Sequence, residues 1–201
     1  MGQCYTVTIK LKNVDEAKLI EKTKEYFADA DDKAQSWFVS TEKIIEFIGC
    51  KNIDNSGSDI LVEKTEDGYE AEGDFDASYA WDDTMIEWFE ACGSAIGDGS
   101  EIWVYPDEGA HMAKKADGIV TSDYYSKAEL VDFNPEQTAI WNKIYQRFPH
   151  LSDDAIEWLK EGIADYDNDL VYYFEENEDM IEDYITEEER EAIEQLMEEE
   201  S

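Results

Sequence analysis

Basic residues are scarce in this sequence. Sixteen lysine and arginine residues stand against 52 aspartate and glutamate residues, which gives a formal net charge of −36 and a pI near 4.1. A chain with this charge is repelled by nucleic acid and by anionic membrane surfaces, and it is attracted to basic protein surfaces. The composition therefore argues against direct binding of nucleic acid or membranes, and it favours a basic protein as the partner.

Cysteine is rare, and long apolar runs are missing. The three cysteines, Cys4, Cys50 and Cys92, are odd in number, far apart and without a CxxC pair, which favours a reducing compartment over a disulfide framework. We also expect no signal peptide and no membrane-spanning segment, because no apolar stretch has the required length. These features predict a cytoplasmic protein.

Recognisable catalytic motifs are missing as well. Neither of the two histidines, His111 and His150, has a cysteine or another histidine at zinc-ligand spacing, so both are expected on the surface or in the core. There is no nucleophile elbow or Cys/His signature, and residues 97–100 are too short for a phosphate loop. Carboxylate pairs are too common here to indicate acid–base chemistry. We therefore expect that the protein is not an enzyme and that it uses no cofactor.

The first 121 residues show alternating strand and helix patterns. Apolar and polar residues alternate over residues 5–11, which predicts a strand, and Asn13 with Glu16 predicts a helix start. A short helix is expected over residues 41–48, and a hairpin over residues 60–65 and 69–75. A longer helix over residues 81–92 and two strands over residues 101–105 and 111–115 follow. A loop is expected over residues 52–59. This order predicts an α+β domain with an antiparallel sheet, helices on one face and the β-α-β-β-α-β order of ferredoxin-like folds.

The pattern changes after residue 121. Residues 122–133 are interpreted as a connection, and residues 134–201 as an acidic helical region. Three helix starts are indicated there, by Asn134 before Pro135, by Ser152, and by Thr186 with Glu189 at the capping-box position.

Residues 152–201 hold the highest density of charge, with 21 acidic residues against two basic ones. Apolar residues recur among them at helical spacing, in three stripes: Ile156, Leu159 and Ile163; Leu170, Phe174, Ile181 and Ile185; Ile193, Leu196 and Met197. The carboxylates form rows on the remaining faces. The rows are Asp153, Glu157, Glu161 and Asp165; Glu175, Glu176, Asp179, Glu182 and Asp183; and Glu187, Glu191, Glu194 and Glu198. Like charges at i,i+4 destabilise a helix by roughly 0.2–0.5 kcal/mol per pair, so we interpret these rows as a partner-binding surface.

One stretch of the acidic region is a candidate metal site. Asp165, Asp167, Asp169 and Glu176 match the first, third, fifth and twelfth ligand positions of an EF-hand. Leu170, however, stands where the sharp turn of that loop requires glycine. Calcium binding is therefore kept as an alternative hypothesis.

The leading functional hypothesis is mimicry of nucleic acid. Rows of carboxylates on packed helices can imitate the negative charge of a duplex and occupy the binding site of a basic nucleic-acid-binding protein. In charge and size the chain resembles phage and mobile-element inhibitors of host defence, such as anti-CRISPR and anti-restriction proteins. The alternative is a general acidic protein–protein interaction module. The identity of the target, the choice between DNA and RNA, and the oligomeric state stay open.

Overall fold

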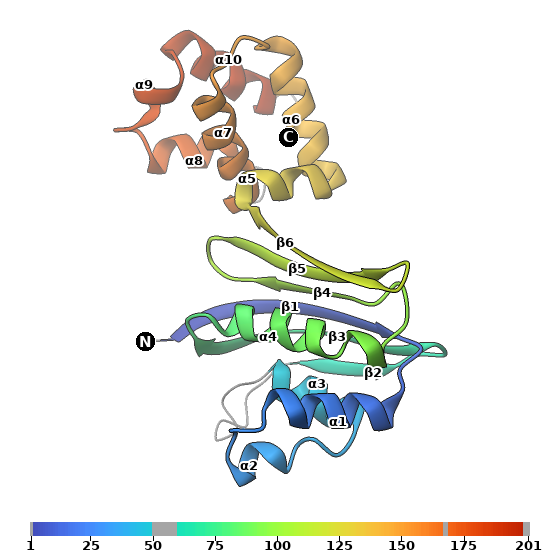
Figure 1. Ribbon diagram of the computed structural model, residues 1–201. Coiled ribbons are helices and arrows are strands. Elements are labelled where there is room, and N and C mark those ends of the chain that lie inside the picture. Colours follow the sequence, from blue (N-terminus) through green and yellow to red (C-terminus); the bar gives the residue numbers. More distant parts are fainter. Residues whose placement is uncertain (1, 50–59, 167–168, 199–201) are drawn as a thin grey trace. The chain divides into compact units, whose positions relative to one another are not determined.

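The protein consists of two compact units. The computed structural model describes residues 2–49, 60–166 and 169–198. Unit 1 is Met1–Tyr124 and unit 2 is Tyr125–Ser201 (Figure 1). Each unit has a hydrophobic core of its own.

Unit 1 is built on a six-stranded antiparallel sheet, which confirms the predicted α+β class. Its strands are β1 (Gly2–Lys12), β2 (Leu61–Lys64), β3 (Gly68–Ser78), β4 (Glu101–Tyr105), β5 (Gly109–Ala116) and β6 (Ile119–Ser126). Their order across the sheet is β2-β3-β1-β4-β5-β6. The sequence predicted at most five strands, one fewer than the structure has. The ferredoxin-like arrangement stays a prediction. The loop expected over residues 52–59 lies outside the described residues.

The long strand β1 is the centre of this sheet. It pairs with β3 on one side and with β4 on the other, so that Val7 lies between Gly73 and Val104. The alternation seen in the sequence is realised in space, because Tyr5, Val7, Ile9 and Leu11 are all buried. These four side chains therefore form one continuous line in the core of unit 1.

The helices of unit 1 pack into the same core. They are α1 (Glu16–Tyr26), α2 (Asp32–Gln35), α3 (Thr41–Ile48), α4 (Trp81–Ala91) and the 3-10 turn η1 (Gly93–Ala95). Two tryptophans join α4 to its neighbours: Trp88 Nε1 donates to Thr23 Oγ1 at 3.0 Å, and Trp81 Nε1 donates to the Ile48 carbonyl at 2.9 Å. Both indole N–H groups are thereby satisfied inside the core.

The start of α1 differs from the prediction. Asp15, not Asn13, is the N-cap, and its carboxylate accepts from the backbone N–H of Lys18 at 3.2 Å. Asn13 instead has a φ of +47°, a left-handed conformation that asparagine tolerates better than most residues. The predicted helix start was therefore wrong by two residues.

The strand β6 was not predicted from the sequence. It follows β5 through a tight turn at Asp117 and Gly118, whose φ values of +53° and +76° suit a two-residue hairpin turn. Most of its side chains are exposed, and Ile119 is 64% exposed. The strand therefore lacks the alternation of buried and exposed residues that reveals a strand in a sequence.

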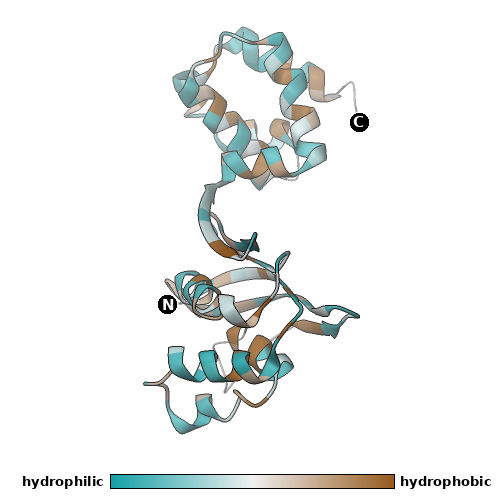
Figure 2. Ribbon diagram, turned by 45° about the vertical axis from the view of Figure 1, so that its right-hand side comes forward, coloured by the Kyte–Doolittle hydropathy of each residue, from teal (hydrophilic) through white to brown (hydrophobic). Residues whose placement is uncertain are grey.

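Unit 2 is helical. It contains α5 (Lys127–Leu130), the 3-10 turn η2 (Val131–Phe133), α6 (Pro135–Arg147), α7 (Asp153–Asp165), α8 (Leu170–Glu176), α9 (Ile181–Tyr184) and α10 (Glu187–Glu198). The three predicted helix starts are confirmed, because Asn134, Ser152 and Thr186 each accept a backbone N–H of the following helix. Hydrophilic and hydrophobic segments alternate along these helices (Figure 2). Within the described part of the chain, no helix combines the length and the apolar character needed to cross a bilayer.

Candidate functional site

The clearest row of carboxylates lies on α7. Asp153, Glu157 and Asp165 are exposed and Glu161 is half-buried, four residues apart along the helix. The residues buried on α7 lie between them in sequence and join the core of unit 2: Ala155, Trp158, Leu159, Gly162 and Ile163. Packing of that face fixes the rotation of the helix and thereby the direction of the acidic row.

Glu161 experiences its acidic neighbours directly. Partial burial raises the pKa of this carboxyl group, and the charges of Glu157 and Asp165 raise it further, against a smaller opposing effect of Lys127. Burial also raises the pKa of the Tyr173 hydroxyl, and Glu161 and Asp165 add to that rise. The middle of the row is thus a region of concentrated negative potential.

A hollow lies beside the first half of this row. Its volume is about 450 Å³, and its lining includes Asp153, Glu157, Glu129 and Lys160. Lys160 is held on Asp132 at 2.8 Å and over the ring of Trp141. The hollow therefore offers three carboxylates around a lysine that already has a partner.

The second predicted row does not lie on one helix. Glu175 and Glu176 end the seven-residue helix α8, Asp179 lies in the following turn, and Glu182 and Asp183 lie on the four-residue helix α9. All five are exposed. The apolar stripe behind them is confirmed, since Leu170, Phe174, Ile181 and Ile185 are buried. The turn between the helices breaks the regular spacing that the sequence suggested.

The third row, on α10, is partly neutralised. Glu187 and Glu191 are exposed, whereas Glu194 accepts from Arg190 Nε at 2.8 Å. The side chain of Glu198 lies outside the described residues. At the start of the helix, the capping box is complete, because Glu189 Oε2 accepts from the backbone N–H of Thr186 at 2.8 Å. That hydrogen bond is the main reason why the pKa of Glu189 is lowered.

The EF-hand-like residues that are described have other partners. Asp165 Oδ1 is 2.7 Å from Lys127 Nζ, and Asp169 caps α8 by accepting from the backbone N–H of Tyr172. Glu176 is close enough to Tyr172 to raise the pKa of its hydroxyl. Asp167 lies outside the described residues. Calcium binding here stays a prediction.

An acidic surface on unit 1 was missed by the sequence analysis. Four exposed carboxylates alternate with core residues along β3: Glu70, Glu72, Asp74 and Asp76. Glu70 and Glu72, with Glu63 of β2 and Glu101 of β4, also line a hollow of about 440 Å³. The alternating acids over residues 70–76 were the available signal, because a strand with one buried face points every second side chain to the other face.

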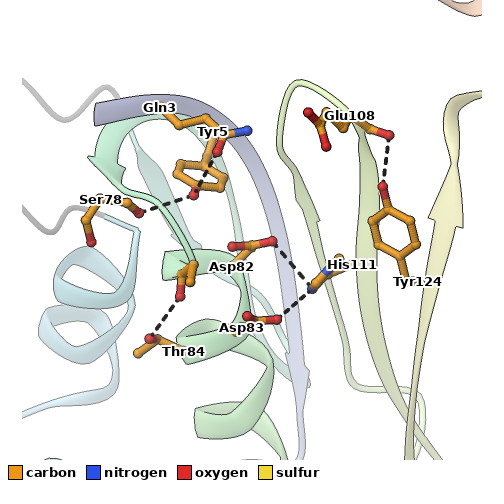
Figure 3. A network of polar contacts seen from close by, with 10 residues as sticks. Gln3, Tyr5, Ser78, Asp82, Asp83, Thr84, Glu108, His111 and Tyr124 are labelled. Carbon is orange, nitrogen blue, oxygen red and sulfur yellow. Dashed lines mark hydrogen bonds and ion pairs between the residues drawn. The ribbon is translucent and has the colours of Figure 1, made fainter. Parts of the chain in front are cut away.

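A second missed feature joins α4 to β5 (Figure 3). Asp82 and Asp83 lie in the first turn of α4, and His111 lies on β5. His111 Nδ1 is 3.5 Å from Asp82 Oδ2 and 3.3 Å from Asp83 Oδ1. Each of these three side chains offers an atom that could bind a metal ion, and the three atoms lie within 4.8 Å of one another. No other such group is found in the described part of the chain. Their sequence spacing gave no signal, since only the packing of the helix on the strand brings them together.

Comparison of the chain with protein families, with curated proteins and with solved structures found no match.

Proposed function

We propose that this chain is a non-enzymatic acidic protein that binds the nucleic-acid site of a basic protein in place of DNA or RNA. The observation that carries the proposal is the row on α7, in which four carboxylates at intervals of four residues line one helix. After burial, the charges of Glu157 and Asp165 are the next causes of the raised pKa of Glu161, which supports the closeness of these carboxylates. A basic site evolved to hold phosphates would attract such a row electrostatically.

The spacing of the carboxylates limits how closely one row imitates a duplex, whereas the order of the helix favours binding. Side chains at i and i+4 lie about 5–6 Å apart on a helix surface, and a duplex carries about one negative charge per 1.7 Å of axis over its two strands. One row alone is therefore less dense than a duplex, but carboxylates of α8, α9 and α10 belong to the same unit. Because Trp158, Leu159 and Ile163 are buried, α7 is already ordered before a partner binds. Binding then loses little conformational entropy.

A host-defence nuclease or related nucleic-acid-binding protein is the target class that we infer, on the basis of the charge and size of the chain. Such a target acts in the cytoplasm. Free thiols at Cys4 and Cys92 support that location.

The second candidate function is a general acidic interaction module. Two observations favour it: Lys127 and Arg190 interrupt the acidic rows by pairing with Asp165 and Glu194, and unit 1 has an acidic surface of its own on β3. In this case the partner would be a basic protein whose binding of nucleic acid is not affected.

Competition separates the two functions. Immobilised protein should capture a basic protein from a bacterial lysate at low salt and release it in a salt gradient. The captured protein is then offered a labelled duplex and a labelled single strand of RNA, with and without this chain. Displacement of either nucleic acid, weakening as the salt concentration rises, supports mimicry. A complex that binds nucleic acid as well as the free target does would contradict it.

A five-site variant locates the surface. Conversion to the corresponding amides is made at five exposed carboxylates of unit 2: Glu157, Glu175, Glu176, Glu182 and Asp183. The matched control makes the same change of charge at five exposed carboxylates of unit 1: Glu21, Asp29, Asp32, Glu42 and Glu66. We expect the first variant to lose at least tenfold in affinity and the control to lose much less. Equal losses would mean that net charge, not the unit 2 surface, decides binding.

For the architecture of unit 1 we infer a ferredoxin-like arrangement extended by two strands. The inference is supported by the position of β1 between β3 and β4, with β2 beyond β3. It is also supported by the connection of β1 to β2 and of β3 to β4 through helices.

A further inference from the structure

The geometry of Asp82, Asp83 and His111 differs from that of an ordinary hydrogen-bonded group. The distances from His111 Nδ1 to the two carboxylates, 3.5 and 3.3 Å, exceed the usual range of about 2.7–3.2 Å for a nitrogen–oxygen hydrogen bond. The other histidine provides a contrast, since His150 Nε2 lies 2.9 Å from Glu189 Oε1. Three donor atoms thus face one another, all within 4.8 Å, at a spacing that leaves room between them.

We propose that Asp82, Asp83 and His111 bind a zinc ion. Zinc lies about 2.0–2.2 Å from nitrogen and oxygen ligands, so two ligands of a tetrahedral site are about 3.3–3.6 Å apart. The two distances from His111 to the carboxylates have these values. Two of the three spacings among the donor atoms therefore match a tetrahedral zinc site, and the third lies within 4.8 Å.

The burial of Asp82 also favours a bound cation. Of the acidic and basic residues that the structure describes, Asp82 is the buried one, with 8% of its surface exposed. Buried charges in proteins are paired or coordinate metals, because loss of hydration is otherwise too costly. The cationic partner that the structure gives Asp82 is His111, whose ring is charged only when protonated, and the same ring also faces Asp83. A divalent cation would neutralise both carboxylates together while His111 stays neutral.

Neighbouring side chains lie against two of the three ligands, His111 and Asp82. The ring of Tyr124 meets His111 edge to face, with 4.8 Å between the ring centroids, and its hydroxyl donates to the Glu108 carbonyl at 2.9 Å. Tyr5 is next to Asp82: its hydroxyl pKa is raised first by burial and then by that carboxylate. Figure 3 shows these side chains around the cluster. Neighbouring groups of this kind orient the ligands of metal sites.

The donor set indicates the class of metal. Magnesium and calcium prefer sites made of oxygen ligands, whereas imidazole nitrogen suits zinc and its transition-metal neighbours. Two carboxylates and one imidazole also leave the fourth position of a tetrahedral zinc ion for water or for a group of a partner. The bound ion would join the start of α4 to β5 and stabilise unit 1.

The two histidines make a direct test possible in the intact chain. Because the sequence contains only His111 and His150, each ring gives separate proton and nitrogen signals in a ¹H–¹⁵N NMR spectrum. Zinc chloride is titrated into the protein in the presence of excess magnesium, which occupies loosely binding surface carboxylates. We expect the His111 signals to saturate at one zinc per chain with Nδ1 as the ligand. The His150 signals should change much less and serve as the internal control.

Substitutions then test the individual ligands. His111→Gln and Asp83→Asn should each weaken zinc binding by at least about tenfold, and His150→Gln should leave it unchanged. Asp83→Asn is the variant less expected to disturb the fold, because 60% of the Asp83 side chain is exposed. The site is excluded if His111 and His150 respond alike, if binding does not saturate at one equivalent, or if Asp83→Asn binds zinc as the parent does. These outcomes are independent of whether the protein imitates nucleic acid.

Discussion

Unit 1 and unit 2 accommodate their excess of acid in different ways. Unit 1 has 28 acidic and 11 basic residues among 124, whereas unit 2 has 24 and five among 77. On β3 of unit 1 the carboxylates alternate with core residues, and Lys10 of β1 lies 3.7 Å from Glu70. On α7 of unit 2, successive carboxylates follow one another on the same helix face. Helix α7 thus places its acids in one row, whereas on β3 one acid faces a lysine of the neighbouring strand and the others face uncharged residues of β1.

The cores of the two units differ correspondingly. Unit 1 is held by buried aliphatic and aromatic side chains from four strands and several helices. Unit 2 depends on a smaller cluster around Trp158, which stacks on Tyr184 with 4.9 Å between centroids and contacts Tyr173 and Phe174. Repulsion between carboxylates in unit 2 therefore acts against a smaller core.

The largest expected effect comes from removing that aromatic centre. Trp158→Ala should destabilise unit 2 by about 3–5 kcal/mol, because a large buried side chain leaves a cavity. Trp88→Ala, at a fully buried position in unit 1, is the matched change. Hydrogen exchange read by mass spectrometry, peptide by peptide, should show lost protection in unit 2 for the first variant and in unit 1 for the second. If either variant loosens both units equally, their cores are not independent.

A smaller effect is expected at two glycines. A Cβ added at Gly162 of α7 would meet the ring of Tyr173 at 2.3 Å, so Gly162→Ala should cost unit 2 about 1–3 kcal/mol through overpacking. A Cβ at Gly118 of unit 1 meets nothing within 4 Å, but its φ is +76°. Gly118→Ala should therefore cost about 1 kcal/mol through backbone strain alone. Urea denaturation measures the free energy of unfolding of both variants. A larger loss of stability for Gly118→Ala than for Gly162→Ala would contradict the prediction.

The smallest expected effect concerns the charges of the α7 row. Because the pKa of Glu161 is raised in the folded state, its contribution to stability is fully present below its unfolded pKa and is lost as the pH rises through the folded pKa. Glu161→Gln removes two like-charge pairs and should stabilise unit 2 at pH 7 by about 0.4–1 kcal/mol. The gain should disappear on acidification. A variant that is no more stable than the parent at pH 7 would contradict this electrostatic account.

Glu189 serves as the control, because its pKa is lowered in the folded state whereas that of Glu161 is raised. Its pKa is lowered mainly by the backbone N–H of Thr186, so its stabilisation is present above its unfolded pKa and is lost as the pH falls through the folded pKa. Glu189→Ala should lower the stability of unit 2 at pH 7 by about 0.5–1 kcal/mol, as the loss of a helix cap does. Thermal unfolding at pH 7 and pH 4 distinguishes the two variants, since their difference should shrink at the lower pH.

The sequence predicted those features of the fold that depend on local periodicity and capping. The alternation around Val7 identified β1, and the caps at Asn134, Ser152 and Thr186 located three helices correctly. It failed at β6, whose exposed side chains show no alternation, although the Asp117–Gly118 pair was a turn signal. Local patterns also could not show that a turn separates α8 from α9.

The candidate sites were predictable to different degrees. The exposed carboxylates of α7 followed from helical spacing, because one helix contains both the apolar stripe and the acidic row. The cluster of Asp82, Asp83 and His111 did not, because its members belong to two elements whose packing is set by the core of unit 1. Nor could a sequence reveal that Lys127 reaches Asp165.

The strand β6 spans the division between the two units, since it covers Ile119–Ser126 while the division falls after Tyr124. Any attempt to produce either unit alone by cutting the chain there would sever a strand, so that one fragment keeps most of β6 and the other begins with its last two residues. Fragments that end after Ser126, or start at Lys127, respect the strand and are the better choice for separating the two halves.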